Sequence, residues 1–311
     1  MTSSGALPSV SVVVPVFNGA ETIGDMLQAL VTQSPVPEDM EIIVVDNGST
    51  DGTAEIVSRF PQVLLLTESR RGPSAARNRG LRAARHELVL HCDADTLPSR
   101  RWVWELARCL AGTDAHIAAG KTLSYPPTTA AERYIGRAQM YEAEFNIARP
   151  VMPFAASMNM AVRRDSALEI RGWNEEMMTA EDVDFSTRLL ARYPEPIRYA
   201  QGAVLFHRNR SSDAALRKQA WTYGEGAADT YRRYPSVVTW KVRQYLALVP
   251  TLAGRSLAPL WLRAVRILGM ANEGQIEHAR YHRMWTWWFW GGFFSFYRHG
   301  ERRPMWSGEG G

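Results

Sequence analysis

Residues 88–99 read LVLHCDADTLPS, a stretch that joins an apolar strand to a pair of aspartates. Side chains alternate along an extended chain, so Asp93 and Asp95, with Ala94 between them, point to the same side. Two neighbouring carboxylates repel each other unless a cation lies between them. The pattern is typical of a Mg²⁺ or Mn²⁺ site, because these ions prefer oxygen ligands. It is also compatible with a helix-capping or loop pair before Pro98.

The sequence upstream alternates short apolar runs with helical patterns. We predict strands at 10–16, 41–45, 63–66 and 87–90, and helices at 21–32, 53–59 and 74–85. Such alternation is typical of βαβ units, which form a parallel sheet covered by helices on both faces. The sequence therefore predicts an α/β fold with a central, mostly parallel sheet flanked by helices.

Polar side chains follow the predicted strands where each of them ends. Asn18 follows the first strand, Asp46 and Asp51 follow the second, and Asp93 and Asp95 follow the fourth. In open parallel sheets, ligands bind beyond the carboxyl ends of the strands. This convergence favours the cation site over the capping interpretation of the aspartate pair.

Beyond residue 128 the pattern changes. We expect one helix over 130–148, a pair of strands within PFAASMNMAVRRD at 153–165, a helix behind Glu181, Asp182 and Asp184, and a strand over 198–207. Acids in a first helical turn complement the helix dipole, but a carboxylate there can also act as a general base. His207 either has a structural role or completes a metal shell.

Two further side chains have alternative interpretations. Arg77 could bridge to Asp46 or contact a nucleotide, or it could be a solvated helix charge. Trp173, in GWNEE, could be an exposed ring on which a sugar stacks, or a core residue.

Seven motifs in chain order are similar to the signature set of family 2 glycosyltransferases, which have the Rossmann-like GT-A fold: VPVFN, VVDNGSTDGT, GPSAARNRG, HCDAD, NMAVRRD, GWNEE and AEDVDFSTRL. The resemblance covers residues 9 to 210, and the ordered set is far more specific than a D-x-D pair alone. It implies an inverting, metal-dependent transfer of a sugar from a nucleotide-diphosphate donor, most commonly a UDP-sugar, to a hydroxyl acceptor. The implied cofactor is Mn²⁺ or Mg²⁺.

The resemblance also implies roles for individual residues. Asp182 matches the catalytic base, with Glu181 beside it. The implied metal ligands are Asp95, Asp93 and His207. The implied donor-binding residues are Pro15, Phe17, Asn18, Asp46, Arg77, Asp93 and Ala94. Independently of the resemblance, we predict acceptor contacts at Trp173 and Asn159.

The chain divides by charge. Residues 1–200 carry 20 Lys and Arg against 25 Asp and Glu, whereas residues 201–311 carry 16 against 7 and eight of the eleven tryptophans. We predict a catalytic domain over 1–210, with nucleotide-sugar binding in 9–120 and the acceptor and catalytic part in 121–210. A helical, basic, tryptophan-rich extension follows over 211–311.

The extension has two interpretations. One is a helical subdomain that packs its aromatic side chains on the core. The other, which we favour, is a peripheral contact with an anionic membrane through 240–300, centred on the aromatic segment 284–297. It would suit a lipid-linked or cell-envelope acceptor. Nucleic-acid binding is disfavoured, because the arginines are spread out and no known module surrounds them.

Composition sets the remaining limits. The 311 residues are 46% hydrophobic and 22% charged, as in globular proteins. Two cysteines are too few for a disulfide framework, and the N-terminus does not resemble a signal peptide, so we expect a cytoplasmic location that includes the inner face of the cell membrane. A catalytically inactive nucleotide-sugar-binding or scaffold protein is the main alternative. Nucleotidyl transfer is disfavoured, because VPVFNGAET is not a glycine-rich, basic phosphate loop.

Overall fold

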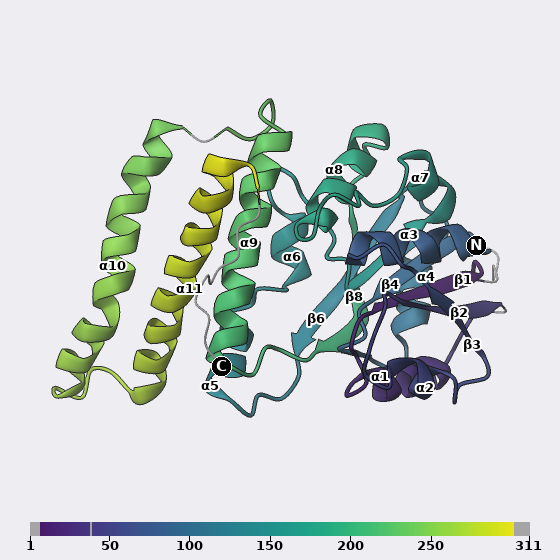
Figure 1. Ribbon diagram of the computed structural model, residues 1–311, viewed down its shortest axis with the longest axis horizontal. Helices are drawn as coiled ribbons and strands as arrows, with labels where there is room; N and C mark the ends of the chain where they lie inside the picture. The colour runs from purple at the N-terminus through teal and green to yellow at the C-terminus, as the bar shows by residue number, and fades with distance from the viewer. Residues whose placement is uncertain (1–6, 38, 240, 302–311) are drawn as a thin grey trace, which may run out of the picture. The chain divides into compact units, whose positions relative to one another are not determined.

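The computed structural model of the chain describes residues 7–37, 39–239 and 241–301 (Figure 1). These residues group into two compact units. The first comprises residues up to 125 together with 141–208, and the second comprises 126–140 together with residues from 209 onward. The sequence-based division placed 126–140 in the catalytic domain, whereas the structure groups this segment with the C-terminal helices.

The first unit is built on one eight-stranded sheet in the order β3-β2-β1-β4-β7-β6-β8-β5. Its strands are β1 (Val10–Val16), β2 (Met40–Asp46), β3 (Val63–Thr67), β4 (Leu88–Cys92), β5 (Thr96–Pro98), β6 (Ile117–Ser124), β7 (Asn159–Arg163) and β8 (Arg198–His207). The pairs β1–β2, β1–β4, β2–β3 and β6–β8 are parallel, and β7 pairs antiparallel with both β4 and β6, as β5 does with β8. The predicted mostly parallel sheet is confirmed.

Helices cover both faces of this sheet (Figure 1). They are α1 (Ile23–Val31), α2 (Thr53–Val57), α3 (Pro73–Ala83), α4 (Trp102–Leu110), α6 (Ala143–Ile147), α7 (Arg164–Glu169) and α8 (Glu181–Arg192). Alternation along β1 divides the core, because Val12 and Val14 pack in the cluster that contains α1 and α4, while Val13 packs in the cluster that contains α3 and α8. The β-branched run at 10–16 is thus buried on both sides, as in other parallel sheets.

Three local predictions are wrong. The segment 153–165 contains one strand, β7, because the backbone N–H of Ala155 donates to Ser186 Oγ instead of to a neighbouring strand. The predicted helix at 130–148 is two helices, α5 (Ala130–Ala138) and α6, because Gln139 adopts a left-handed φ of 48° between them. Strands β5 and β6 were not predicted. The first is three residues long, and the second has a small-residue sequence, IAAGKTLS.

The second unit consists of helices, as predicted: α5, α9 (Asp213–Arg233), α10 (Val242–Arg266) and α11 (Glu273–His299). Helices α9 and α11 approach closely at two glycines. A Cβ at Gly292 would collide with the carbonyl oxygen of Trp221, and one at Gly224 would collide with that of Phe289. None of the helices in the described ranges is long and apolar enough to cross a membrane.

We expect Gly292→Ala to lower the free energy of unfolding of the helical unit by about 1–3 kcal/mol, because the added methyl forces two backbones apart. Gly254→Ala in α10 is the matched control, since a Cβ there meets nothing within 4 Å. The same change should raise helix stability by about 0.5–1 kcal/mol. Urea unfolding followed by tryptophan fluorescence measures both, and equal effects of the two variants would contradict the close packing of α9 and α11.

Candidate active site

The loops after β1 and β2 are joined to each other at one edge of the sheet. Asn18 Oδ1 accepts a 2.9 Å hydrogen bond from the backbone N–H of Thr50, and the N–H of Asn18 donates to Ser49 Oγ. Asp46, which ends β2, accepts at 2.9 Å from the N–H of Ser49. Because β1, β2 and β4 are parallel neighbours, these groups lie at the sheet edge where β4 leads into Asp93.

An exposed aromatic surface lies on these loops. The Phe17 ring is exposed, and the guanidinium carbon of Arg71 lies 4.6 Å from its centroid. Asn47, buried beside Asp46, holds the segment that carries Arg71, since its side chain accepts from the N–H of Gly72 at 2.8 Å. Pro15 is half-buried in β1 just before this surface. The Phe17 ring is thus a flat, accessible surface next to Asn18, whose loop is hydrogen-bonded to the loop that follows Asp46.

Arg77 connects two elements that are far apart in the sequence. Its side chain is 3% exposed, and it donates at 2.9 Å to Asp93 Oδ1 and at 2.8 Å to Glu181 Oε1. Burial would lower the pKa of Arg77, but Asp93 and Glu181 outweigh this effect and raise its pKa. Arg77 therefore pairs with Asp93 and Glu181, and the bridge to Asp46, one of the alternatives considered, is not the one formed.

The buried side chain of His91 lies near Arg77 and is neutral. It lies on β4 two residues before Asp93, and its ring packs edge-on against Trp173 with centroids 5.3 Å apart. Burial, and then the charge of Arg77, lower the pKa of His91 to about 3. The ring therefore adds no second positive charge beside Arg77 at neutral pH. Its position in an apolar strand gave no indication of this role.

Asp182 occupies the first turn of α8, next to Glu181. Its Oδ1 accepts from the backbone N–H of Val183 at 2.9 Å. Burial, and then the negative charge of Glu181, raise the pKa of Asp182 to about 7 against the lowering influence of Arg77. A carboxylate with a raised pKa is a stronger proton acceptor than an ordinary aspartate. The dipole interpretation of these acids is compatible with the same position.

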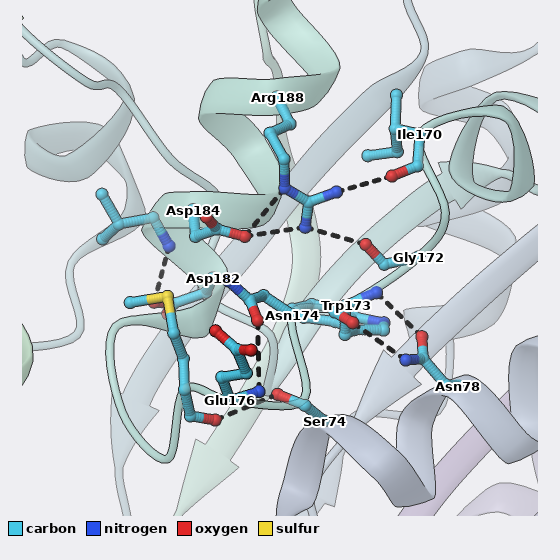
Figure 2. A network of polar contacts seen from close by, with 12 residues as sticks. Ser74, Asn78, Ile170, Gly172, Trp173, Asn174, Glu176, Asp182, Asp184 and Arg188 are labelled. Carbon is cyan, nitrogen blue, oxygen red and sulfur yellow. Dashed lines mark hydrogen bonds and ion pairs between the residues drawn. The ribbon is translucent and has the colours of Figure 1, made fainter. Parts of the chain in front are cut away.

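Helix α8 is tied to the loop before it by Arg188, which forms a partly buried ion pair with Asp184. Asp184 and Arg188 approach within 2.7 Å, and Arg188 donates to the carbonyl oxygens of Ile170 and Gly172 at 2.7 and 2.8 Å (Figure 2). Because Asp184 and Arg188 are one helical turn apart, the i,i+4 spacing in EDVDFSTRL could have indicated the pair. Arg188 thus fixes the start of the loop that leads to the acidic turn.

Asn78 holds the same loop from α3. Its Nδ2 donates to the carbonyl oxygen of Trp173 at 2.9 Å, and its Oδ1 accepts from the N–H of Trp173 at 2.8 Å (Figure 2). The Trp173 ring is 2% exposed and stacks on Phe185 with centroids 4.3 Å apart. The expectation of an exposed ring for sugar stacking is therefore wrong, and the core interpretation of Trp173 holds.

Asn159 is also part of the framework. It is 1% exposed. It accepts from Trp102 Nε1 at 2.8 Å and donates to Thr122 Oγ1 at 3.2 Å. Its burial argues against the predicted contact with an acceptor, because both ends of the amide bond to protein groups.

Asp95 and His207 lie together because β5 pairs with β8. Thr96 is opposite His207 in the ladder, and His207 Nε2 lies 3.8 Å from Asp95 Oδ1. The buried His207 ring also packs on Tyr141, with centroids 4.7 Å apart. Ala94, between the two aspartates, is nearly buried. An oxygen donor beside an imidazole suits Mn²⁺ or Mg²⁺ when substrate oxygens complete the shell.

The described part of the chain contains no group of three or more His, Cys, Asp or Glu side chains that could hold a metal by themselves. Asp93, predicted as a third ligand, is paired with Arg77. The residues therefore fit a cation held by two protein ligands and by its substrate, and do not fit a closed protein cage.

We expect Arg77→Met to lower the free energy of unfolding by about 3 kcal/mol, because it leaves two carboxylates without their shared cation. Arg79→Met is the control, since Arg79 lies two residues along α3 and is exposed. That change should stay within about 0.5 kcal/mol. Chemical denaturation measures both variants, and similar effects would show that the Arg77 bridge contributes little.

The family model for glycosyl transferase family 2 matches residues 11–171. The glycosyltransferase AglE of Haloferax volcanii is 29% identical over 83% of this chain and 87% of its own length. The pre-mycofactocin glycosyltransferase of Mycobacterium tuberculosis is 27% identical over 73% of this chain. The match covers 48% of the length of that relative.

Solved structures agree on the fold. The mannosyltransferase PcManGT from Pyrobaculum calidifontis, in complex with GDP-Man and Mn²⁺, has a TM-score of 0.63 and 19% identity over 95% of this chain and 88% of its own. Staphylococcus aureus TarS 1–349 in complex with UDP-GlcNAc has a TM-score of 0.51 and 17% identity over 95% of this chain and 93% of its own. The likeness confirms the predicted GT-A fold. With the family match over 11–171, it follows that the chain belongs to glycosyl transferase family 2.

Proposed function

We propose that this glycosyltransferase inverts the configuration of the sugar that it moves from a nucleotide-diphosphate donor to an acceptor hydroxyl, and that it requires a divalent cation. One observation carries the proposal. The guanidinium of Arg77 joins Asp93, on the donor side of the sheet, to Glu181, the neighbour of Asp182. A donor-side carboxylate and the neighbour of the candidate base thus belong to one ion-pair network.

In this proposal the loops after β1 and β2 bind the nucleoside. The exposed Phe17 ring offers a face for the base, while Asn18 and Asp46 are held in place by backbone N–H groups. Asp93 lies next to the ribose or the metal. We propose a UDP-sugar as the donor, on the resemblance of the motifs. Arg77 acts by orienting Asp93, because its burial keeps it away from a base bound at Phe17.

Asp95 and His207 would hold the cation, which supplies a Lewis acid that offsets the charge on the departing diphosphate. Asp95 directly precedes β5 and His207 ends β8, so the pairing of Thr96 with His207 keeps the two side chains close. A ligand on a rigid strand, as His207 is, holds such a site more accurately than one on a loop.

Asp182 is the proposed general base. Its Oδ1 is oriented by the N–H of Val183, and the acceptor hydroxyl would give its proton to this carboxylate as the oxygen attacks the anomeric carbon. Attack from the face opposite the diphosphate inverts the configuration, because a single displacement occurs. We propose a lipid-linked or cell-envelope hydroxyl compound as the acceptor.

We expect Asp182→Asn to retain nucleotide binding but to lower the transfer rate by about 10²–10⁴-fold, because it removes only the proton acceptor. Asp95→Ala should lose both cation-dependent nucleotide binding and transfer. Asp165→Asn, at an exposed carboxylate of α7, is the control and should behave as wild type. The assay is release of nucleotide diphosphate from a panel of UDP- and GDP-sugars with Mn²⁺, alongside calorimetric titration of UDP and GDP.

Two outcomes would count against the proposal. Transfer by Asp182→Asn at the wild-type rate would contradict the base assignment. A wild-type chain that binds a nucleotide sugar with Mn²⁺, yet releases no nucleotide diphosphate from any donor with or without candidate acceptors, would favour an inactive binding or scaffold protein.

The raised pKa of Asp182 predicts the pH dependence of transfer. The value of kcat/KM should rise as the pH rises through about 7, because Asp182 accepts a proton only after losing its own. Glu181→Gln removes the neighbouring negative charge that raises this pKa, so the rise should move to lower pH. Glu55→Gln, at an exposed position of α2, is the control. A rise that moves upward or stays in place in Glu181→Gln would contradict the assignment.

A further inference from the structure

One side of α10 is an exposed apolar surface. Its largest members are Leu246, Val249, Leu257, Leu260 and Trp261, whose exposed fractions lie between 55 and 70%. These positions recur at helical spacing and lie within one third of the helix circumference. Pro250, Ala253 and Ala264 fill the same side and are exposed as well. We name these eight residues the apolar stripe of α10.

The stripe continues into the turn between α10 and α11. Ile267, Leu268 and Met270 follow it, and Ile267 is 87% exposed. From Leu246 to Leu268 the surface is about 33 Å long at the rise of an α-helix. None of the side chains that form this surface is charged, although the segment 246–268 includes three arginines on other sides of the helix. Exposed apolar patches of this extent are rare on monomeric proteins and mark contact surfaces.

The opposite side of α10 already has a partner within the helical unit. Leu248 is buried. Arg255 donates to Thr286 Oγ1 at 2.9 Å, and Ser256 Oγ accepts from Trp287 Nε1 at 3.0 Å, so this side of α10 packs on α11. The three arginines that interrupt the apolar sequence, at 255, 263 and 266, therefore lie off the stripe. Periodicity, and not a continuous apolar run, produces the surface.

The aromatic segment 284–297 is not the main exposed surface. Phe293 and Phe296 are buried in a cluster with Ala228 of α9. Among its aromatic side chains only Trp287 is strongly exposed. The sequence-based expectation centred a membrane contact on this segment, whereas most of its rings pack inside the helical unit. The exposed apolar surface belongs to α10 instead.

Charge indicates what covers the stripe. Residues 230–272 contain seven Lys and Arg and no Asp or Glu, and Arg263 is exposed beside the stripe. A second copy packed stripe to stripe would bring these like charges together, at a cost in binding. An anionic lipid surface complements them, and Trp261 is a residue type that favours the headgroup region.

We infer that the apolar stripe of α10 binds the surface of an anionic lipid bilayer, with the helix lying in the plane of the interface. Leu246, Val249, Leu257, Leu260 and Trp261 enter the boundary between headgroups and acyl chains, while Arg263 contacts anionic headgroups. The helix lies on the membrane, because it is too weakly apolar to cross one. The inference does not depend on the proposed transfer reaction and is tested without a donor or acceptor.

The test is flotation of the full chain with vesicles of phosphatidylcholine alone, and with vesicles of equal parts phosphatidylglycerol and phosphatidylcholine. Wild type should float with the mixed vesicles and less with the neutral ones or at high salt. Leu257→Glu combined with Leu260→Glu should reduce binding at least about tenfold, because two charges enter the apolar interface. Both residues are exposed, so the fold should survive; circular dichroism checks this.

The matched control is Thr251→Glu combined with Gln275→Glu. It adds the same charge at exposed positions off the stripe, and a Glu at 275 can still serve the capping box of α11. The control should float like wild type. Equal loss in both double variants would assign binding to net charge alone and overturn the inference. So would undiminished binding by Leu257→Glu with Leu260→Glu, or a wild-type dimer that these changes dissociate while no vesicle binding is seen.

Discussion

The buried guanidinium of Arg77 is the interaction on which the site depends. Asp93 directly follows β4, and Glu181 is the first residue of α8. Their two carboxylates would repel each other without the guanidinium between them. A buried charge is costly unless it is paired and hydrogen-bonded, and Arg77 is both. The same ion pairs that stabilise this charge hold the donor edge of the sheet against the acidic turn.

The framework around Arg77 separates residues that hold the site from residues that can act in it. Asn78 fixes the backbone of Trp173, and Arg188 fixes the carbonyls of Ile170 and Gly172, so the loop that leads to the acidic turn is held by both α3 and α8. Asp182 shares that turn but is oriented by a backbone N–H. Its raised pKa reflects burial first and Glu181 second, which makes the anchoring of Glu181 by Arg77 part of the electrostatics of the proposed base.

The sequence predicted the features that depend on local pattern. Apolar runs placed five of the strands, β1 to β4 and β8, and polar residues at the strand ends placed Asp46, Asp93 and Asp95 at one sheet edge. Long-range packing was not visible. Trp173 is buried because Phe185 covers it, and Asn159 is structural because Trp102 and Thr122 lie beside it. The stripe of α10 was hidden because Arg255, Arg263 and Arg266 interrupt the apolar run in sequence, although they lie on other sides of the helix.

A double-mutant cycle between Arg77 and Glu181 tests the central role of this ion pair most directly. The free energies of unfolding of Arg77→Met, Glu181→Gln and the combined variant are compared with that of the wild type. Because each single change leaves a buried group without its partner, the combined loss should be smaller than the sum of the single losses by about 1–3 kcal/mol. Losses that add without any coupling would contradict the account.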